Sequence, residues 1–279
     1  MEKIDKKNQN CNVTNNISIY NSNVAIGCCN ANNITNECEE QKRILRELIL
    51  RFVEGGKYHN EVLGYVGVNA NPSVVSPKER YVIARKYVGK PDNWKEEESR
   101  IRKIESDLKQ GKPMFQIVTE GNNVLSDEAL KVVEKVDEIF NYVIEVINKE
   151  ERALNPKEFA DKVYIVVDEI IRTHKIEFNK EKDTVNEFGY MIGFCILATY
   201  SYSFWYDAAI HENNAWYNIL DIDDSKSIKA PPRWLRRIGQ ALVAVGKDIV
   251  SYCDAREENG IIDSIGVAAS QSVTAFTEK

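Results

Sequence analysis

The sequence predicts a mainly α-helical protein, a multi-helix globular domain preceded by a short N-terminal arm that is extended or hairpin-like. Three observations support this. After residue 38, apolar residues recur every three and four positions, the period of one helix face. Several of these stretches begin with a helix-capping residue and end in glycine or proline. Residues 1–38, by contrast, are rich in asparagine, which favours turns over helices.

The composition is that of a globular protein. The chain has 279 residues, of which 43% are hydrophobic and 29% charged, so it can bury a substantial core as one large domain or two small ones. The formal net charge is −6, and acidic and basic residues alternate without forming a basic stripe. We therefore expect no nucleic-acid partner.

The first predicted helix begins at Glu39. Its apolar face consists of Ile44, Leu45, Leu48, Ile49 and Phe52. Two adjacent glycines, Gly55 and Gly56, predict its end. The pattern over residues 57–68 is ambiguous, and a loop is expected at residues 69–72.

Two capped helices should follow. Ser76, with a proline and a glutamate after it, predicts a helix that runs to about Tyr87. Asn93 is predicted to cap a highly charged surface helix that ends at Gly111. Residues 113–121 read as a strand.

Long helices dominate the rest of the chain. Ser126 and Asn155 each precede an amphipathic stretch, and the second is followed by the proline and glutamate of a capping box. A further helix is expected from residue 184 to about 213. Another should begin after Pro232, and small residues after Gly260 indicate a close-packed terminal helix.

One uncharged stretch, residues 188–206, approaches the length of a membrane span. Its tyrosines, serines and threonine favour a buried core helix instead, so we expect no transmembrane segment. The first residues also lack the apolar segment of a secretion signal. We expect synthesis in the cytoplasm, with display on a spore or cell surface left open.

Motifs of common enzymes and metal sites are not found in the sequence. The three histidines have no cysteine or second histidine at ligand spacing, and no phosphate-binding glycine loop is present. His59 and Glu61 are interpreted as structural. The acidic stretch at residues 221–227 lacks the glycine and glutamate of a calcium loop and is interpreted as a turn. We predict no cofactor, no metal and no catalytic residue.

An aromatic stretch offers an alternative function, a ligand-binding protein or enzyme with a pocket around residues 200–217. Buried aromatic core is the favoured interpretation of the same residues. The alternative pocket would be lined by Tyr200, Tyr202, Trp205, Tyr206, Asp207 and His211.

The arm contains two short strand-like pieces in which apolar and polar residues alternate. The apolar positions are Ile17, Ile19, Val24 and Ile26. So short a hairpin is marginal by itself, and an unpaired strand seeks a sheet edge to pair with. The arm is therefore predicted to contact another subunit, although a disordered tail is the competing interpretation.

Four of the six cysteines lie in the arm, at Cys11, Cys28, Cys29 and Cys38. Adjacent cysteines do not readily bond to each other, so Cys28 and Cys29 would each need a distant partner. Disulfide cross-links are the favoured interpretation. Zinc binding, without a Cys-x-x-Cys pair, and reduced free thiols are the alternatives.

Parts of residues 57–279, including "YHNEVLGYV", "ATYSYSFWYD" and the small-residue C-terminal stretch, resemble uncharacterised bacterial helical proteins. The resemblance implies a bacterial helical domain and no particular activity. Those proteins usually begin with a lipoprotein signal, which this sequence lacks, and the arm lies outside the resemblance.

Together these observations predict an arm, residues 1–38, and a helical domain, residues 39–279. The predicted function is that of a non-enzymatic structural protein that self-associates into a homo-oligomer through the arm, as in a filament or surface assembly.

Overall fold

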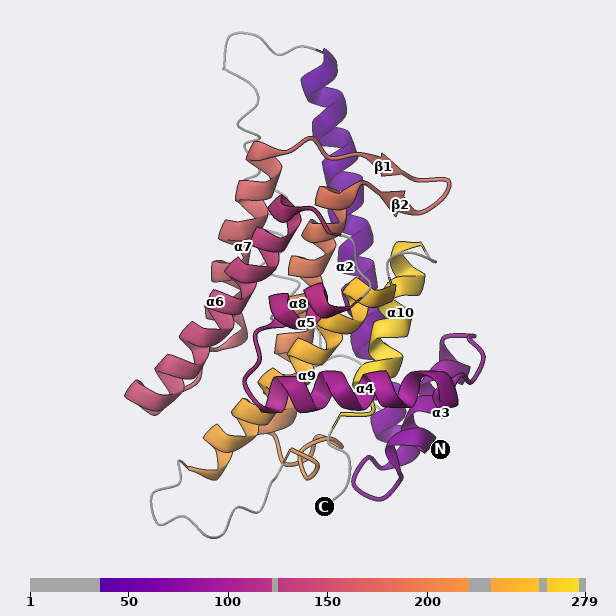
Figure 1. Ribbon diagram of the computed structural model, residues 1–279, viewed down its shortest axis with the longest axis vertical. Helices are drawn as coiled ribbons and strands as arrows, with labels where there is room; N and C mark the ends of the chain where they lie inside the picture. Colours follow the sequence, from indigo (N-terminus) through magenta and orange to yellow (C-terminus); the bar gives the residue numbers. More distant parts are fainter. Residues whose placement is uncertain (1–35, 122–124, 221–231, 256–259, 276–279) are drawn as a thin grey trace.

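The computed structural model describes residues 36–121, 125–220, 232–255 and 260–275 (Figure 1). The predicted mainly α fold is confirmed. In chain order the described elements are α2 (Asn36–Ala70), α3 (Pro77–Tyr87), α4 (Trp94–Lys109), α5 (Met114–Glu120), α6 (Asp127–Glu150), α7 (Pro156–Thr173), β1 (Phe178–Asn179), β2 (Thr184–Val185), α8 (Glu187–Ile210), α9 (Arg233–Asp254) and α10 (Ile261–Ser272).

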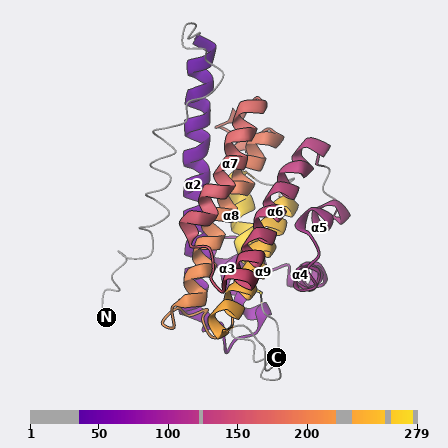
Figure 2. The ribbon, with the colours of Figure 1, turned by 90° about the vertical axis from the view of Figure 1, so that its left-hand side faces the viewer.

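Helix α8 lies at the centre of the fold and packs against α9, α2 and α7. Helix α10 packs against both α2 and α9, so the first and last described helices are neighbours. Figure 2 shows α2 on one side of the molecule and α4 and α5 on the other, with α8 and α9 between them. The predicted solvated helix α4 thus covers α9 with one face.

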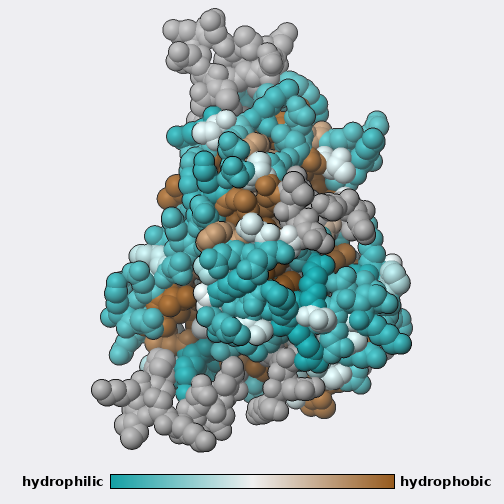
Figure 3. Space-filling view, in the orientation of Figure 1, coloured by the Kyte–Doolittle hydropathy of each residue, from teal (hydrophilic) through white to brown (hydrophobic). Residues whose placement is uncertain are grey.

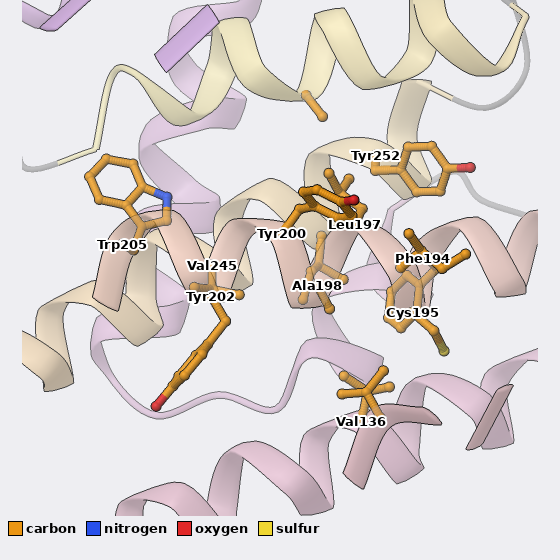
Figure 4. Close-up of a cluster of buried hydrophobic side chains, with 14 of the residues drawn as sticks. Val136, Phe194, Cys195, Leu197, Ala198, Tyr200, Tyr202, Trp205, Val245 and Tyr252 are labelled. Carbon is orange, nitrogen blue, oxygen red and sulfur yellow. The ribbon is translucent and has the colours of Figure 1, made fainter. Parts of the chain in front are cut away.

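The burial of α8 explains its uncharged sequence. Nearly every side chain from residue 189 to 202 is buried, on all faces of the helix. In Figure 4, Trp205 leaves α8 on one side, whereas Tyr202 and Cys195 leave it on the side where Val136 of α6 lies. None of the described helices has the length and hydrophobicity of a membrane span.

Most of the predicted caps are confirmed. Ser76 and Asn155 each form a complete capping box, and the Ser126 hydroxyl accepts the backbone N–H of Ala129. Helix α4 begins directly after Asn93, as predicted, but the Asn93 side chain makes no capping hydrogen bond. Its side-chain oxygen accepts the Tyr81 hydroxyl at 2.5 Å, a tertiary contact that removes it from the helix end.

Residues 113–121 form helix α5 rather than the expected strand. The carboxylate of Asp137 on α6 accepts the backbone N–H groups of Met114 and Phe115, both at 2.9 Å. These are among the amides that the first turn of a helix leaves without partners. Asp137 of α6 thus caps α5, and for this reason the sequence around residue 113 does not predict where α5 begins.

Helix α2 does not end at Gly55 and Gly56, as the sequence predicted, but continues to Ala70. A Cβ atom at Gly55 would lie 2.3 Å from Ile265 of α10, and one at Gly56 would lie 2.4 Å from the Tyr200 ring of α8. The two glycines therefore serve close packing on two neighbouring helices.

The short hairpin β1–β2, which the sequence did not predict, pairs Phe178 with Val185 and Asn179 with Thr184. Asp183 in its turn binds Arg51 of α2 through two hydrogen bonds, at 2.7 and 3.0 Å. The Asp183 backbone oxygen also accepts the first amide of α10, and its carboxylate accepts the second.

The visible surface is mainly hydrophilic, with apolar residues in separate patches (Figure 3). The exposed apolar side chains of the described residues include Val68, Val74 and Ile165.

Two glycines of α2 form a matched pair for testing the packing. We expect Gly56→Ala to lower the free energy of unfolding by roughly 1–3 kcal/mol, because its methyl group would overlap the Tyr200 ring. We expect Gly64→Ala to raise it by about 0.5–1 kcal/mol, because nothing lies within 4 Å of the added carbon and alanine favours a helix. Urea unfolding of both variants checks this, and equal effects would contradict the packing.

Candidate functional site

A cluster of fully buried polar side chains joins three helices at the centre of the fold. Asp248 of α9 accepts hydrogen bonds from Ser201 Oγ at 2.5 Å and Trp205 Nε1 at 3.1 Å, both to Oδ2. Its other oxygen lies 2.9 Å from Nε2 of His59 on α2. All four side chains are 0% exposed. Asp248 thus joins α8 through two hydrogen bonds to one oxygen, and α2 through the close approach of its other oxygen to His59.

Charge stabilises this cluster. Burial is the largest influence on His59 and would lower its pKa, but the negative charge of Asp248 and the acceptor oxygens of Asp248 and Asn60 together outweigh burial and raise the pKa. When His59 is protonated, the two side chains form a buried ion pair. Such a pair gives little net stability compared with apolar packing, but removing one partner is costly because the other charge is left buried alone.

The arrangement differs from a nucleophilic triad. In a triad the imidazole lies between the hydroxyl and the carboxylate, so that it can take the hydroxyl proton. Here the carboxylate of Asp248 lies between Ser201 and His59. The Ser201 hydroxyl is also closed off from solvent. The geometry is that of a structural junction.

A second buried cluster lies on the other side of α9. Lys247 is 0% exposed, with Nζ 3.0 Å from Glu105 of α4 and 2.7 Å from the Thr274 hydroxyl. Glu105 also binds Lys109 at 2.6 Å. Burial alone would raise the pKa of Glu105, but the charges of Lys247 and Lys109 outweigh burial and lower it to about 2.

Arg80 of α3 is a buried cation near the ends of two helices. Its guanidinium donates to the backbone oxygen of Pro72, just beyond α2, at 2.5 Å, and to that of Ala275, just beyond α10, at 3.2 Å. Helix C-termini carry partial negative charge, which favours a cation there. Although burial lowers the pKa of Arg80 to about 10, the group stays charged at neutral pH.

The residues of the alternative pocket do not form one open site. Tyr200, Tyr202 and Trp205 are buried, and Tyr206 is partly buried. The Tyr202 ring stacks on Phe159 at 4.1 Å, and its hydroxyl donates to a backbone oxygen.

The last two residues of that group, Asp207 and His211, form a surface ion pair at 2.7 Å. The arm positions Ile17, Ile19, Val24 and Ile26 lie outside the described residues, as do Cys11, Cys28 and Cys29. Cys38 falls in the first turn of α2, where only the backbone is described. Cys195 and Cys253 are buried in the core.

The sequence does not predict the buried polar contacts described above, and it indicates only a structural role for His59. The residues not predicted are Ser201, Asp248, Lys247, Glu105 and Arg80. One signal was present in α9, where a lysine and an aspartate interrupt an otherwise apolar run. Charged residues at core positions need partners, but the sequence does not identify those partners.

Another concave surface lies within the described part of the chain. A groove between α6 and α7 has an apolar floor of Val132, Val166 and Ile170. Charges of both signs surround it and pair across it, as Lys135 and Glu169 do, so the groove favours no ligand charge. Among the described residues, no group of three or more histidine, cysteine or acidic side chains could hold a metal ion.

Asp248→Asn tests the central cluster. We expect a loss of roughly 3–5 kcal/mol in the free energy of unfolding, because the His59 charge stays buried without its counter-ion. The matched control is Asp207→Asn, which breaks a solvent-exposed histidine–aspartate pair and should cost at most about 1 kcal/mol. Urea unfolding measures both. Equal losses would contradict the role given to Asp248.

Lys247 should make stability depend on pH. Burial outweighs the attraction of Glu105 and lowers the pKa of Lys247 to about 8, below its ordinary 10.5. Between these values the unfolded chain binds more protons than the folded chain, so folding gains stability as pH rises. We expect the unfolding free energy of wild type to rise relative to Lys247→Met between about pH 8 and 10.5. A pH-independent difference would contradict this.

Comparison with known proteins yields no family: no family model, no curated protein and no solved structure matches the chain. Its function is therefore inferred from its own residues.

Proposed function

We propose that the chain is a non-enzymatic, self-associating protein whose N-terminal arm joins one copy to another, while the helical domain serves as a rigid support. The observation that carries the proposal is the composition of residues 8–36, which contain no charged side chain. Most of the rest of the chain intersperses acidic and basic residues, apart from the buried uncharged stretch at residues 188–206. An uncharged segment lacks the repulsion that keeps like segments of different copies apart.

The pattern within this segment supports pairing between extended chains. Ile17 and Ile19 form one alternating piece, and Val24 and Ile26 form a second. Extended segments of this kind gain hydrogen bonds when they pair with a strand of another molecule. The arm cysteines add a covalent route between copies wherever the thiols become oxidised.

The helical domain is suited to bear load from the arm. Helix α2 begins at Asn36, directly after the uncharged segment, and has 35 residues. It is fixed to the rest of the fold by His59 at the centre and by Arg51, which binds Asp183. A force applied to the arm is thus passed to the core through buried or partly buried ion pairs.

Sedimentation of the full chain with and without reductant tests the proposal. We expect wild type to sediment as an oligomer, and Ile19→Lys with Ile26→Lys to dissociate it, because charge in the alternating positions opposes strand pairing. A chain that begins at Glu39 should be monomeric. If oxidised cysteines hold the copies together, oligomers should persist on a denaturing gel until reductant is added.

The matched control is Ile165→Lys, which changes an exposed isoleucine of α7 that is 69% accessible. It should sediment like wild type. Monomeric wild type under both oxidising and reducing conditions would refute the proposal, and so would an oligomer that survives loss of the arm.

A further inference from the structure

Both ring nitrogens of His59 face hydrogen-bond acceptors. Nε2 lies 2.9 Å from the Asp248 carboxylate, and Nδ1 lies 2.9 Å from the side-chain oxygen of Asn60. The orientation of the Asn60 amide is set by its nitrogen, which donates to the backbone oxygen of Tyr200 at 3.2 Å. An amide oxygen and an ionised carboxylate cannot donate. An imidazolium cation, with a hydrogen on each nitrogen, fits both of these contacts.

A neutral His59 does not fit this site. Whichever nitrogen lost its proton, a lone pair would face either the Asp248 carboxylate or the Asn60 oxygen. The oxygen facing that bare nitrogen would then be buried without a donor from His59, and the attraction between the His59 and Asp248 charges would be lost. Because His59 belongs to α2, Tyr200 to α8 and Asp248 to α9, this loss falls on the contact of α2 with the two central helices.

We propose that protonation of His59 stabilises the contact of α2 with α8 and α9, and that this contact weakens when the ring loses its proton. We call this arrangement the latch. The latch lies wholly within the helical domain, so it stands or falls independently of the self-association proposed for the arm.

Asp248 is the charged group in direct contact with the His59 ring. The next residue on α9, Lys247, turns to the opposite side and binds Glu105. From α8 the nearby titratable group is the Tyr200 phenol, whose pKa is raised by burial so that it stays neutral.

The other elements packed on α2 direct their charges elsewhere. Asp263, the charged residue of α10, pairs with Lys90 on the surface. In α3, Arg80 binds backbone oxygens near two helix ends and Arg85 binds the backbone oxygen of Pro91. The hairpin contributes Asp183, which pairs with Arg51, about two turns before His59 on α2.

The latch has a defined direction. The folded-state pKa of His59 lies above its ordinary value of 6.5. Its stabilisation is therefore complete below about pH 6.5 and is lost as pH rises through the folded-state pKa. Within that window the equilibrium constant for opening should increase by up to about tenfold for each pH unit.

Nitrogen NMR of the histidines in the intact chain tests the charge directly. We expect one ring, assigned to His59 by its absence from His59→Gln or by its contacts with α8 side chains, to have hydrogens on both nitrogens at pH 7. A His59 ring with one bare nitrogen at pH 6 would overturn the proposal.

Amide hydrogen exchange tests the consequence. Protection factors of α2 around residue 59 in wild type should fall by up to about tenfold per pH unit above pH 6.5, until the folded-state pKa is passed. The control His211→Gln removes the surface pair and should behave like wild type. His59→Gln should show weaker protection with no such pH dependence. If His59→Gln does not fold, wild type and the control decide, and pH-independent α2 protection in both overturns the latch.

Discussion

The arrangement of the central helices depends on the contacts that the Asp248 carboxylate makes with residues of α8 and α2. It is buried without access to water, and it accepts hydrogen bonds from α8 and the charge of His59 from α2. The residue before it, Lys247, carries the opposite charge into the opposite layer, where Glu105 of α4 neutralises it. Helix α9 therefore has two adjacent charged residues. Lys247 finds its partner on α4, and Asp248 finds its partners on α2 and α8, so both sides of α9 must be packed. Breaking either contact would leave a charge buried without its partner, which is costly.

Features that depend on residues close together in the sequence could be predicted from it. Features that depend on contacts between separate helices could not. The starts of α3, α6 and α7 depend on a side chain and an amide three residues apart, so Ser76, Ser126 and Asn155 predict them. The start of α5 depends on Asp137, a residue from another helix, and was misread as a strand. Gly55 and Gly56 looked like a helix end because their reason for being glycine, the approach of α10 and α8, is also tertiary.

The same distinction applies to the site. An aromatic cluster around Tyr200 was visible in the sequence, and so was the isolation of His59 from other ligands. The convergence of His59, Ser201 and Asp248 was not visible, because three separate helices supply them. The two parts of the chain also differ in kind. In the described helices, buried charged side chains pair with one another, whereas residues 8–36 contain no charged side chain. This contrast is why outward association is assigned to the arm and rigidity to the helical domain.

The neighbouring positions of α2 and α10 have a consequence for biosynthesis. As the chain leaves the ribosome, α2 emerges before the described helices that it packs against. Its partner α3 follows closely, but α8 and α10, and the Asp248 carboxylate of α9, follow much later. Until then His59 has no counter-ion, and the apolar face of α2 has no permanent cover. During this interval α2 lacks most of its final contacts, and this is the stage at which a chaperone would be most useful and a premature encounter between chains most harmful.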